Sequence, residues 1–196
     1  MPNPATRSAP VPVIVDVDTG LDDALALAFL AQEPAVRLLA VTCVAGNTSV
    51  DNAVSNTATV LHALGLASPP PIGRGSSGPL LGQTRPAHGF HGTDGLGGIQ
   101  LRRTGEHASP PHAIELMRDT ILTSPQPVTL LALGPLTNVA LLIRCYPDIA
   151  ARLERIMFMG GTMSVVNLAI PSGGGHMITI ANPTNWAPDI DRVTTD

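Results

Sequence analysis

Four aspartates lie within eight consecutive positions near the start of the chain, and their spacing is suited to holding a metal ion. They belong to the run Asp16-Val17-Asp18-Thr19-Gly20-Leu21-Asp22-Asp23. Carboxylates this close repel one another and raise each other's pKa. A hard divalent cation removes that repulsion, and oxygen-rich sites suit Ca²⁺ or Mg²⁺. The run therefore predicts a cation site in which Asp18 leaves a strand, Gly20 permits a tight turn and Asp23 returns from a helix.

Two simpler interpretations of this run account for less of it. Helix capping explains Asp22 and Asp23, because acidic residues favour the first turn of a helix. It does not explain Asp16 and Asp18 at the end of an apolar strand, where an unpartnered buried carboxylate is costly. An EF-hand fits poorly, because its loop requires glycine at the sixth position and glutamate at the twelfth.

Short apolar segments and helical segments alternate along the chain and would position these aspartates. The expected strands are 13–17, 36–45, 71–73, 128–133 and 155–159, and the expected helices are 22–32, 48–64, 109–122 and 135–144. Thr48 or Ser49 is expected to cap the second helix. Residues 76–104 are rich in glycine and show no clear period, and a loop of that length is often functional.

The strands are apolar throughout rather than alternating, which favours a parallel sheet covered on both faces. We expect an α/β fold with an open, mostly parallel sheet and helices on both faces, similar to a Rossmann fold. Ligands in such sheets bind outside the carboxyl ends of the strands, where the aspartate run lies. The expected organisation is a disordered N-terminal tail over 1–12, one α/β domain over 13–161, and a divergent tail over 162–196.

The amino-acid composition of the chain argues against some classes of binding partner. The 196 residues carry a net charge of −4 and no lysine, so nothing favours binding to nucleic acid or to an anionic membrane. No apolar run reaches the length of a signal peptide or a transmembrane helix, which predicts a soluble cytoplasmic protein. Cys43 and Cys145 stand in apolar surroundings and are predicted to be buried, unpaired thiols.

The aspartate run, followed by a helix of alanine and leucine, resembles the N-terminal signature of inosine–uridine-type nucleoside hydrolases. These calcium-dependent enzymes cleave the N-glycosidic bond of ribonucleosides. Thr19 stands where the family usually has proline. Four further motifs continue the resemblance in family order as far as residue 161: Val41-Thr42-Cys43-Val44-Ala45-Gly46-Asn47, His91-Gly92-Thr93-Asp94-Gly95-Leu96-Gly97, Leu133-Gly134-Pro135-Leu136-Thr137-Asn138 and Met159-Gly160-Gly161.

The resemblance implies a calcium site and a ribose site. Asp18 and Asp23 would be carboxylate ligands of Ca²⁺, and Leu133 would give a backbone carbonyl. Asp22 would hold a ribose hydroxyl, and Asn47 would form hydrogen bonds around the ribose or the metal.

Other residues are implied to have lesser or alternative roles. Asp16 would support the loop. His91 would contact the ribose or base, or else order its own loop by a hydrogen bond. Asn167 falls where the family has an asparagine near the 5′ side of ribose. Thr137 and Asn138, at a predicted helix start, are interpreted as caps.

The mechanism implied by the resemblance uses a calcium-held water below the anomeric carbon, with Asp18 as general base. Carboxylates would stabilise a transition state that resembles an oxocarbenium ion. The family also implies a homo-oligomer, either a dimer or a tetramer, and it leaves the choice between purine and pyrimidine bases open.

The resemblance fails after Gly161. Glycines replace the expected glutamate and second asparagine, and the family's later aspartate ligand and histidine have no counterpart. Either a frameshift or a genuine divergent form explains this, and we favour the frameshift, with a C-terminally truncated fold. Weak Ca²⁺ affinity and poor turnover are then expected. An inactive remnant that binds metal or ribose weakly is the alternative function. A haloacid-dehalogenase-type phosphatase fits less well, because Gly20 and the Asp22-Asp23 pair depart from its motif.

Overall fold

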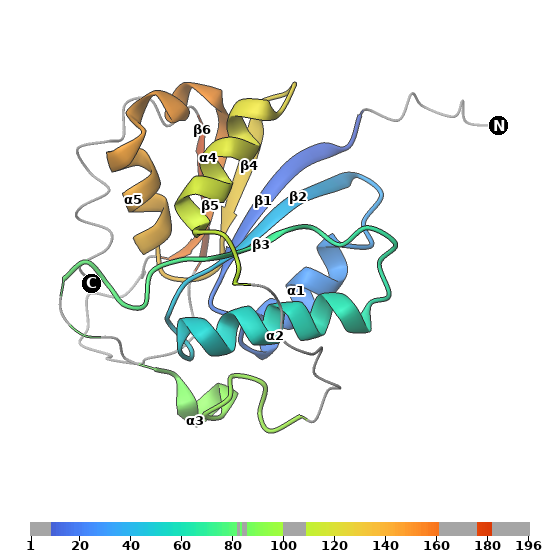
Figure 1. Ribbon diagram of the computed structural model, residues 1–196, viewed down its shortest axis with the longest axis vertical. Coiled ribbons are helices and arrows are strands. Elements are labelled where there is room, and N and C mark those ends of the chain that lie inside the picture. The colour runs from blue at the N-terminus through green and yellow to red at the C-terminus, as the bar shows by residue number, and fades with distance from the viewer. Residues whose placement is uncertain (1–8, 82, 84–85, 100–108, 161–175, 182–196) are drawn as a thin grey trace.

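The computed structural model of the chain describes residues 9–81, 83, 86–99, 109–160 and 176–181. Its elements follow one another as an alternation of strands and helices (Figure 1). They are β1 (Val11–Val17), α1 (Leu21–Leu30), β2 (Val36–Cys43), α2 (Val50–Ala63), β3 (Ile72–Arg74), α3 (His88–His91), α4 (Ala113–Thr123), β4 (Val128–Ala132), α5 (Thr137–Cys145), the 3-10 helix η1 (Pro147–Arg152), β5 (Leu153–Gly160) and β6 (His176–Ala181).

The strands form one sheet in the order β3-β2-β1-β4-β5-β6. Neighbouring strands from β3 to β5 are parallel, and β6 pairs antiparallel with β5. Helices α1 and α2 cover one face, while α4 and α5 cover the other (Figure 1). The expectation of an open, mostly parallel α/β sheet with helices on both faces is confirmed.

Two hydrophobic cores explain why the strands lack a polar face. Successive side chains of a strand point to opposite faces of the sheet. In β1, Val13, Val15 and Val17 therefore pack with Leu27 of α1, whereas Ile14 packs beneath α4 and α5. Both sets are buried, so the strand reads as a continuous apolar run.

The chain order creates a switch point at the carboxyl end of β1. From β1 the chain crosses to β2 on one side, and it later returns to place β4 on the other side of β1. The connections that leave β1 and β4 therefore run to opposite faces of the sheet, and open α/β sheets bind their ligands at such a point. The residues that follow these two strands, Asp18 and Leu133, lie there.

The structure differs from the sequence-based expectations in several places. β1 begins at Val11, two residues before the predicted domain boundary, and the loop over 76–104 contains the short helix α3. Strand β6 was not predicted. Cys43 is buried as expected, but the prediction for Cys145 is wrong, because it lies exposed at the end of α5. Within the described residues, no helix combines the length and apolarity needed to cross a membrane.

The packing of β4 predicts a large stability difference between two leucines. Leu130 is fully buried in β4, whereas Leu25 on α1 is 74% exposed. Leu130→Ala should lower the free energy of unfolding by about 2–5 kcal/mol, because it removes buried methyl groups and leaves a cavity. Leu25→Ala should change it by less than about 0.5 kcal/mol. Urea denaturation measures both, and equal losses in the two variants would contradict this description of the core.

Candidate active site

The carboxyl groups of Asp18 and Asp23 converge at the switch point. Asp18 follows β1 directly, and Asp23 lies in the first turn of α1, with 6% and 4% of their surfaces exposed. The two side chains share a hydrogen bond. Each also accepts a backbone hydrogen bond, Asp18 Oδ2 from Asn47 N at 2.6 Å and Asp23 Oδ2 from Gly20 N at 2.9 Å. The tight turn predicted around Gly20 therefore brings together the two residues expected to hold a cation.

Two glycines make room for this pair. A Cβ atom at Gly46 would collide with Oδ2 of Asp18. A Cβ atom at Gly20 would stand 2.7 Å from His91 Nδ1 and 2.8 Å from Asn47 Nδ2. Both distances are too short for a carbon contact, so a side chain at position 20 would push Asn47 and His91 away from the aspartate turn.

Asp16 anchors the turn from the opposite face of the sheet. It is fully buried, and its Oδ1 accepts hydrogen bonds from Thr42 Oγ1 at 2.6 Å and from Asn138 Nδ2 at 2.8 Å. In the described part of the chain, its Oδ2 has no hydrogen-bond partner. The side chain thus joins β1 to β2 and α5, and it leaves one buried carboxyl oxygen unsatisfied.

The interpretation of Asn138 as a helix cap is wrong. Its amide nitrogen donates to Asp16 and to the carbonyl of Cys43 at 3.0 Å, and its Oδ1 accepts from Ser76 N at 2.9 Å. The N-terminus of α5 has no side-chain cap. Asn138 instead joins three segments, because a fully buried amide must satisfy its donors and acceptor within the protein.

Burial gives the three carboxyl groups unusual acidities. Loss of hydration raises the pKa of Asp16 to about 7, against the hydrogen bonds from Thr42 and Asn138 that lower it. Loss of hydration also raises the pKa of Asp18 to about 6. The pKa of Asp23 lies well above its ordinary value through burial and through the negative charge of Asp18. The buried pair therefore favours a shared proton or a cation over two free negative charges.

The end of β4 lies against the aspartate turn. Leu133 N donates to the carbonyl of Asp16 at 2.8 Å, and Gly134 N donates to the same oxygen at 3.2 Å. A Cβ atom at Gly134 would meet Asp18 N at 3.0 Å. The backbone of Leu133, which was expected to offer a carbonyl to the cation, thus lies beside Asp16 at the end of β1.

His91 reaches the turn from the glycine-rich loop. Its Nδ1 accepts a hydrogen bond from Leu21 N at 3.2 Å and lies 3.9 Å from Asp22 Oδ1. Because Nδ1 accepts, the neutral imidazole carries its proton on Nε2. The side chain of Asp22 is 59% exposed, so it faces outward beside His91 rather than joining the buried pair. Asn167, the remaining predicted site residue, lies outside the described residues.

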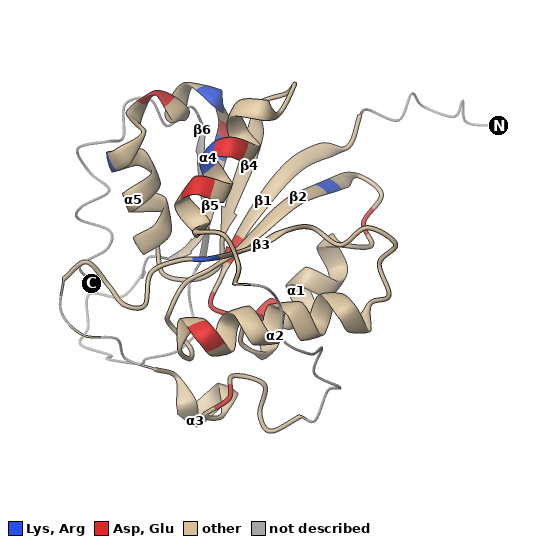
Figure 2. Cartoon of the chain, viewed as in Figure 1, with Lys and Arg blue, Asp and Glu red and all other residues tan. Residues whose placement is uncertain are grey.

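The residues at the turn fit part of a calcium coordination sphere. Calcium takes six to eight oxygen ligands. Within the described residues, no three His, Cys, Asp or Glu side chains group closely enough to hold a metal. Asp18 and Asp23 supply two carboxylates that oppose each other without a cation, and acidic positions gather where β1 passes into α1 (Figure 2). A cation here would complete its shell with backbone oxygen, water or substrate.

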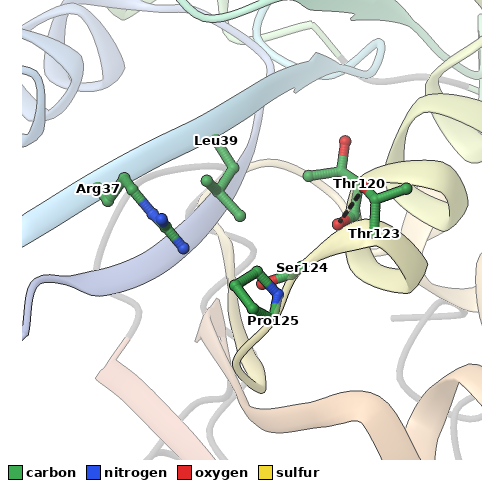
Figure 3. Close-up of a pocket in the computed structure, with 6 residues that line it drawn as sticks. All are labelled: Arg37, Leu39, Thr120, Thr123, Ser124 and Pro125. Carbon is green, nitrogen blue, oxygen red and sulfur yellow. Dashed lines mark hydrogen bonds between the residues drawn. The ribbon is translucent and has the colours of Figure 1, made fainter.

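Two shallow hollows among the described residues lie away from this site. One is formed by Ala28, Phe29, Gln32 and Glu33 on the exposed side of α1. The other, of about 210 Å³, lies between the start of β2 and the end of α4 (Figure 3). Its Arg37 and Leu39 come from the amino-terminal half of β2, opposite the edge that carries the aspartates.

Comparison with known families identifies the protein's ancestry. The family model for inosine–uridine preferring nucleoside hydrolases matches residues 13–188. The chain belongs to this family. The match extends beyond residue 161, where the sequence motifs become less similar.

Relatives and solved structures agree with this membership. The chain is 39% identical to the pyrimidine-specific ribonucleoside hydrolase RihA of Salmonella arizonae over 157 aligned residues. The alignment covers 80% of this chain and 50% of RihA. The chain is 37% identical to the non-specific ribonucleoside hydrolase RihC of Salmonella paratyphi B, over 79% of this chain and 50% of that protein. An inosine-guanosine nucleoside hydrolase superposes with a TM-score of 0.71 and 33% identity, over 78% of this chain and 49% of that one. The chain therefore spans about half the length of the relatives it matches.

Sequence reasoning missed the buried polar residues of α2 that contact the site. Asn56 Nδ2 donates to the carbonyls of Thr19 and Asp94, and Thr57 Oγ1 lies 2.6 Å from Thr19 Oγ1. Both residues are buried in a helix that was assigned only a covering role. The sequence did contain a sign of these contacts: α2 carries many polar residues although it has to pack against an apolar sheet.

The raised carboxyl pKa values predict an unusual pH dependence of stability without metal. A folded-state pKa above the unfolded value of 3.8 means that the folded protein binds extra protons between about pH 4 and pH 7. The contribution of these protonated carboxyl groups to the free energy of unfolding is complete below pH 3.8, and it is lost as the pH rises through 6 and 7. For Asp16 alone the loss is on the order of 4 kcal/mol. Urea denaturation in the presence of a chelator, repeated from pH 5 to pH 8, should therefore show that Asp16 and Asp18 lower the free energy of unfolding as the pH rises.

Asp16→Asn is the matched variant for this measurement. An amide of the same shape does not titrate, so the stability of the variant should fall less over the same pH range. Identical slopes for the variant and the unaltered chain would contradict the assignment of the effect to Asp16.

Proposed function

We propose that this chain hydrolyses the N-glycosidic bond of ribonucleosides, releasing ribose and the free base. The carrying observation is the convergence of Asp18 and Asp23 at the switch point of the sheet, supported by membership of the nucleoside hydrolase family. The relatives described above are named as ribonucleoside or nucleoside hydrolases, which favours the same reaction.

The proposed cofactor is Ca²⁺, held by Asp18, Asp23 and the backbone carbonyl of Leu133. The ion would supply positive charge that offsets the buried carboxylates and orients hydroxyl groups of the ribose. Oxygen donors favour a hard cation of this kind over a transition metal. The described residues offer few oxygens to this ion, so affinity for Ca²⁺ alone should be weak and should rise when a ribose occupies the site.

Asp18 is the proposed general base. Its buried carboxylate accepts the backbone hydrogen bond from Asn47, which restrains its orientation. It would take a proton from the attacking water as the bond to the base breaks. The negative charge of the aspartate pair would stabilise positive charge developing on the ribose ring.

The proposed ribose contacts surround this pair. Asp22 is exposed beside the turn and would accept a hydrogen bond from a ribose hydroxyl. Asn47 lies against Gly20, close enough for its amide to reach the ribose or the cation. His91 would donate through Nε2–H to the ribose or base, because its Nδ1 is engaged by Leu21 N.

The role of Asp18 is tested by substitution. Asp18→Asn should reduce ribose release from inosine and uridine by about 10³-fold or more, because an amide cannot accept the proton. Asp51→Asn, which changes an exposed carboxylate on α2, is the control and should retain activity. Circular dichroism checks that both variants fold, and a folded Asp18→Asn protein with full activity would exclude Asp18 as the base.

The metal requirement is tested by chelation and calorimetry. Removal of divalent ions should abolish hydrolysis, and Ca²⁺ should restore it better than Mg²⁺. Titration with Ca²⁺ should show weak binding that strengthens several-fold in the presence of an amino-sugar mimic of the ribosyl cation. Binding of both ligands without turnover would identify a non-catalytic binder, while hydrolysis that is unaffected by chelator would exclude the metal.

A further inference from the structure

One face of α2 carries a ladder of polar side chains at helical spacing. Asn52 and Asn56 lie four residues apart, which places them above one another on the helix, and Thr48 stands just ahead of α2, four residues before Asn52. Thr48 and Asn56 are 1% and 3% exposed. Polar groups so deeply buried require internal partners.

The partners of this ladder are backbone carbonyls of the glycine-rich loop. Thr48 Oγ1 donates to the carbonyl of Thr93 at 3.2 Å. Asn52 Nδ2 donates to Thr48 Oγ1 at 2.9 Å and reaches the same Thr93 carbonyl at 3.4 Å. Asn56 Nδ2 donates to the carbonyl of Asp94 at 2.7 Å. The helix thus holds two consecutive carbonyls of the loop.

Asn56 also holds the aspartate turn. Its Nδ2 donates to the carbonyl of Thr19 at 3.2 Å, between Asp18 and Gly20 in the chain. The loop approaches closely because Gly95 has a φ of +85°, and a Cβ atom there would lie 2.9 Å from Asn56 Nδ2 and 3.0 Å from the Thr19 carbonyl. One amide group therefore joins the two segments that carry the proposed catalytic residues.

The loop transmits this restraint to His91 through its own hydrogen bonds. Gly97 N donates to the carbonyl of His91 at 2.7 Å. Asp94 Oδ1 accepts from Leu96 N and Gly98 N at 3.1 and 3.2 Å. Fixing Asp94 thus fixes the segment that begins at His91, and His91 Nδ1 meets Leu21 N on the far side of the same turn.

We propose that Asn56 is a positioning residue that sets His91 against the aspartate turn, by binding the carbonyls of Thr19 and Asp94 with one amide. Asn52 and Thr48 hold the adjacent carbonyl and keep the loop aligned with α2. The effect on turnover rests on the proposed nucleoside hydrolase function, whereas the effect on the imidazole of His91 does not.

The test compares Asn56→Ala with Thr59→Val in the full chain. Thr59 is about one turn further along α2 and 4% exposed, and among the described residues its hydroxyl bonds within the helix, to the carbonyl of Ser55 at 2.7 Å. Thr59→Val therefore removes a buried hydrogen bond of α2 without touching either loop. Nitrogen-15 spectra of the imidazoles, with His91 assigned from a His91→Gln variant, report which ring nitrogen carries the proton.

The unaltered chain and Thr59→Val should both show His91 with its proton on Nε2. In Asn56→Ala, His91 should no longer be held in this form, and its spectrum should be an average of the forms protonated on Nδ1 and on Nε2. With uridine or inosine as substrate and Ca²⁺ present, KM should rise about tenfold in Asn56→Ala with little change in kcat, the ratio expected for a lost buried hydrogen bond. A general loss of folded protein would instead lower kcat and leave KM unchanged.

The outcomes separate the two proposals. An unaltered His91 signal in folded Asn56→Ala protein overturns the positioning role, as does an unchanged KM. Absence of turnover in the unaltered chain overturns the proposed function, while the imidazole spectra still decide the role of Asn56. If Asn56→Ala does not fold, the half-buried Asn52→Ala replaces it, with a smaller change in the same direction supporting the proposal and an unchanged His91 signal overturning it.

Discussion

The burial of three carboxyl groups at the end of one strand is the constraint on which the rest of this structure depends. Asp16, Asp18 and Asp23 are withdrawn from water within a few residues of one another, and burial raises the pKa of each. Such a cluster is unfavourable unless hydrogen bonds, a proton or a cation compensate for it. Neighbouring strands, helices and loops provide the hydrogen bonds, and the part that they leave unsatisfied favours a proton or a cation at this turn.

The compensation comes from segments that are far apart in the sequence. Asn138 of α5 reaches Asp16 from one face of the sheet, and Asn47 closes over Asp18 from the loop after β2. Asn56 of α2 reaches the turn from the other face. Two of these donors, Asn138 and Asn56, stand on helices, which hold their amides more rigidly than loops alone would.

The chain spans about half the length of its matched relatives, yet its described residues include a connected set of buried polar groups at the carboxyl end of β1. The aspartate pair and His91 meet around the N-terminus of α1. The relatives differ in the base that they accept, as their names include pyrimidine-specific, non-specific and inosine-guanosine enzymes. Their names share the nucleoside as the substrate class.

The sequence by itself determined the parallel sheet and the pair formed by Asp18 and Asp23. Continuous apolar strands require cover on both faces, and residues five positions apart across a glycine turn meet through local geometry alone. Only the tertiary structure decided the roles of Asn138 and Asn56, because a hydrogen bond between residues as far apart as Asp16 and Asn138, 122 positions, depends on the packing of the whole sheet. A buried asparagine looks the same in the sequence whether it caps a helix or joins two loops, and only its three-dimensional neighbours distinguish the two.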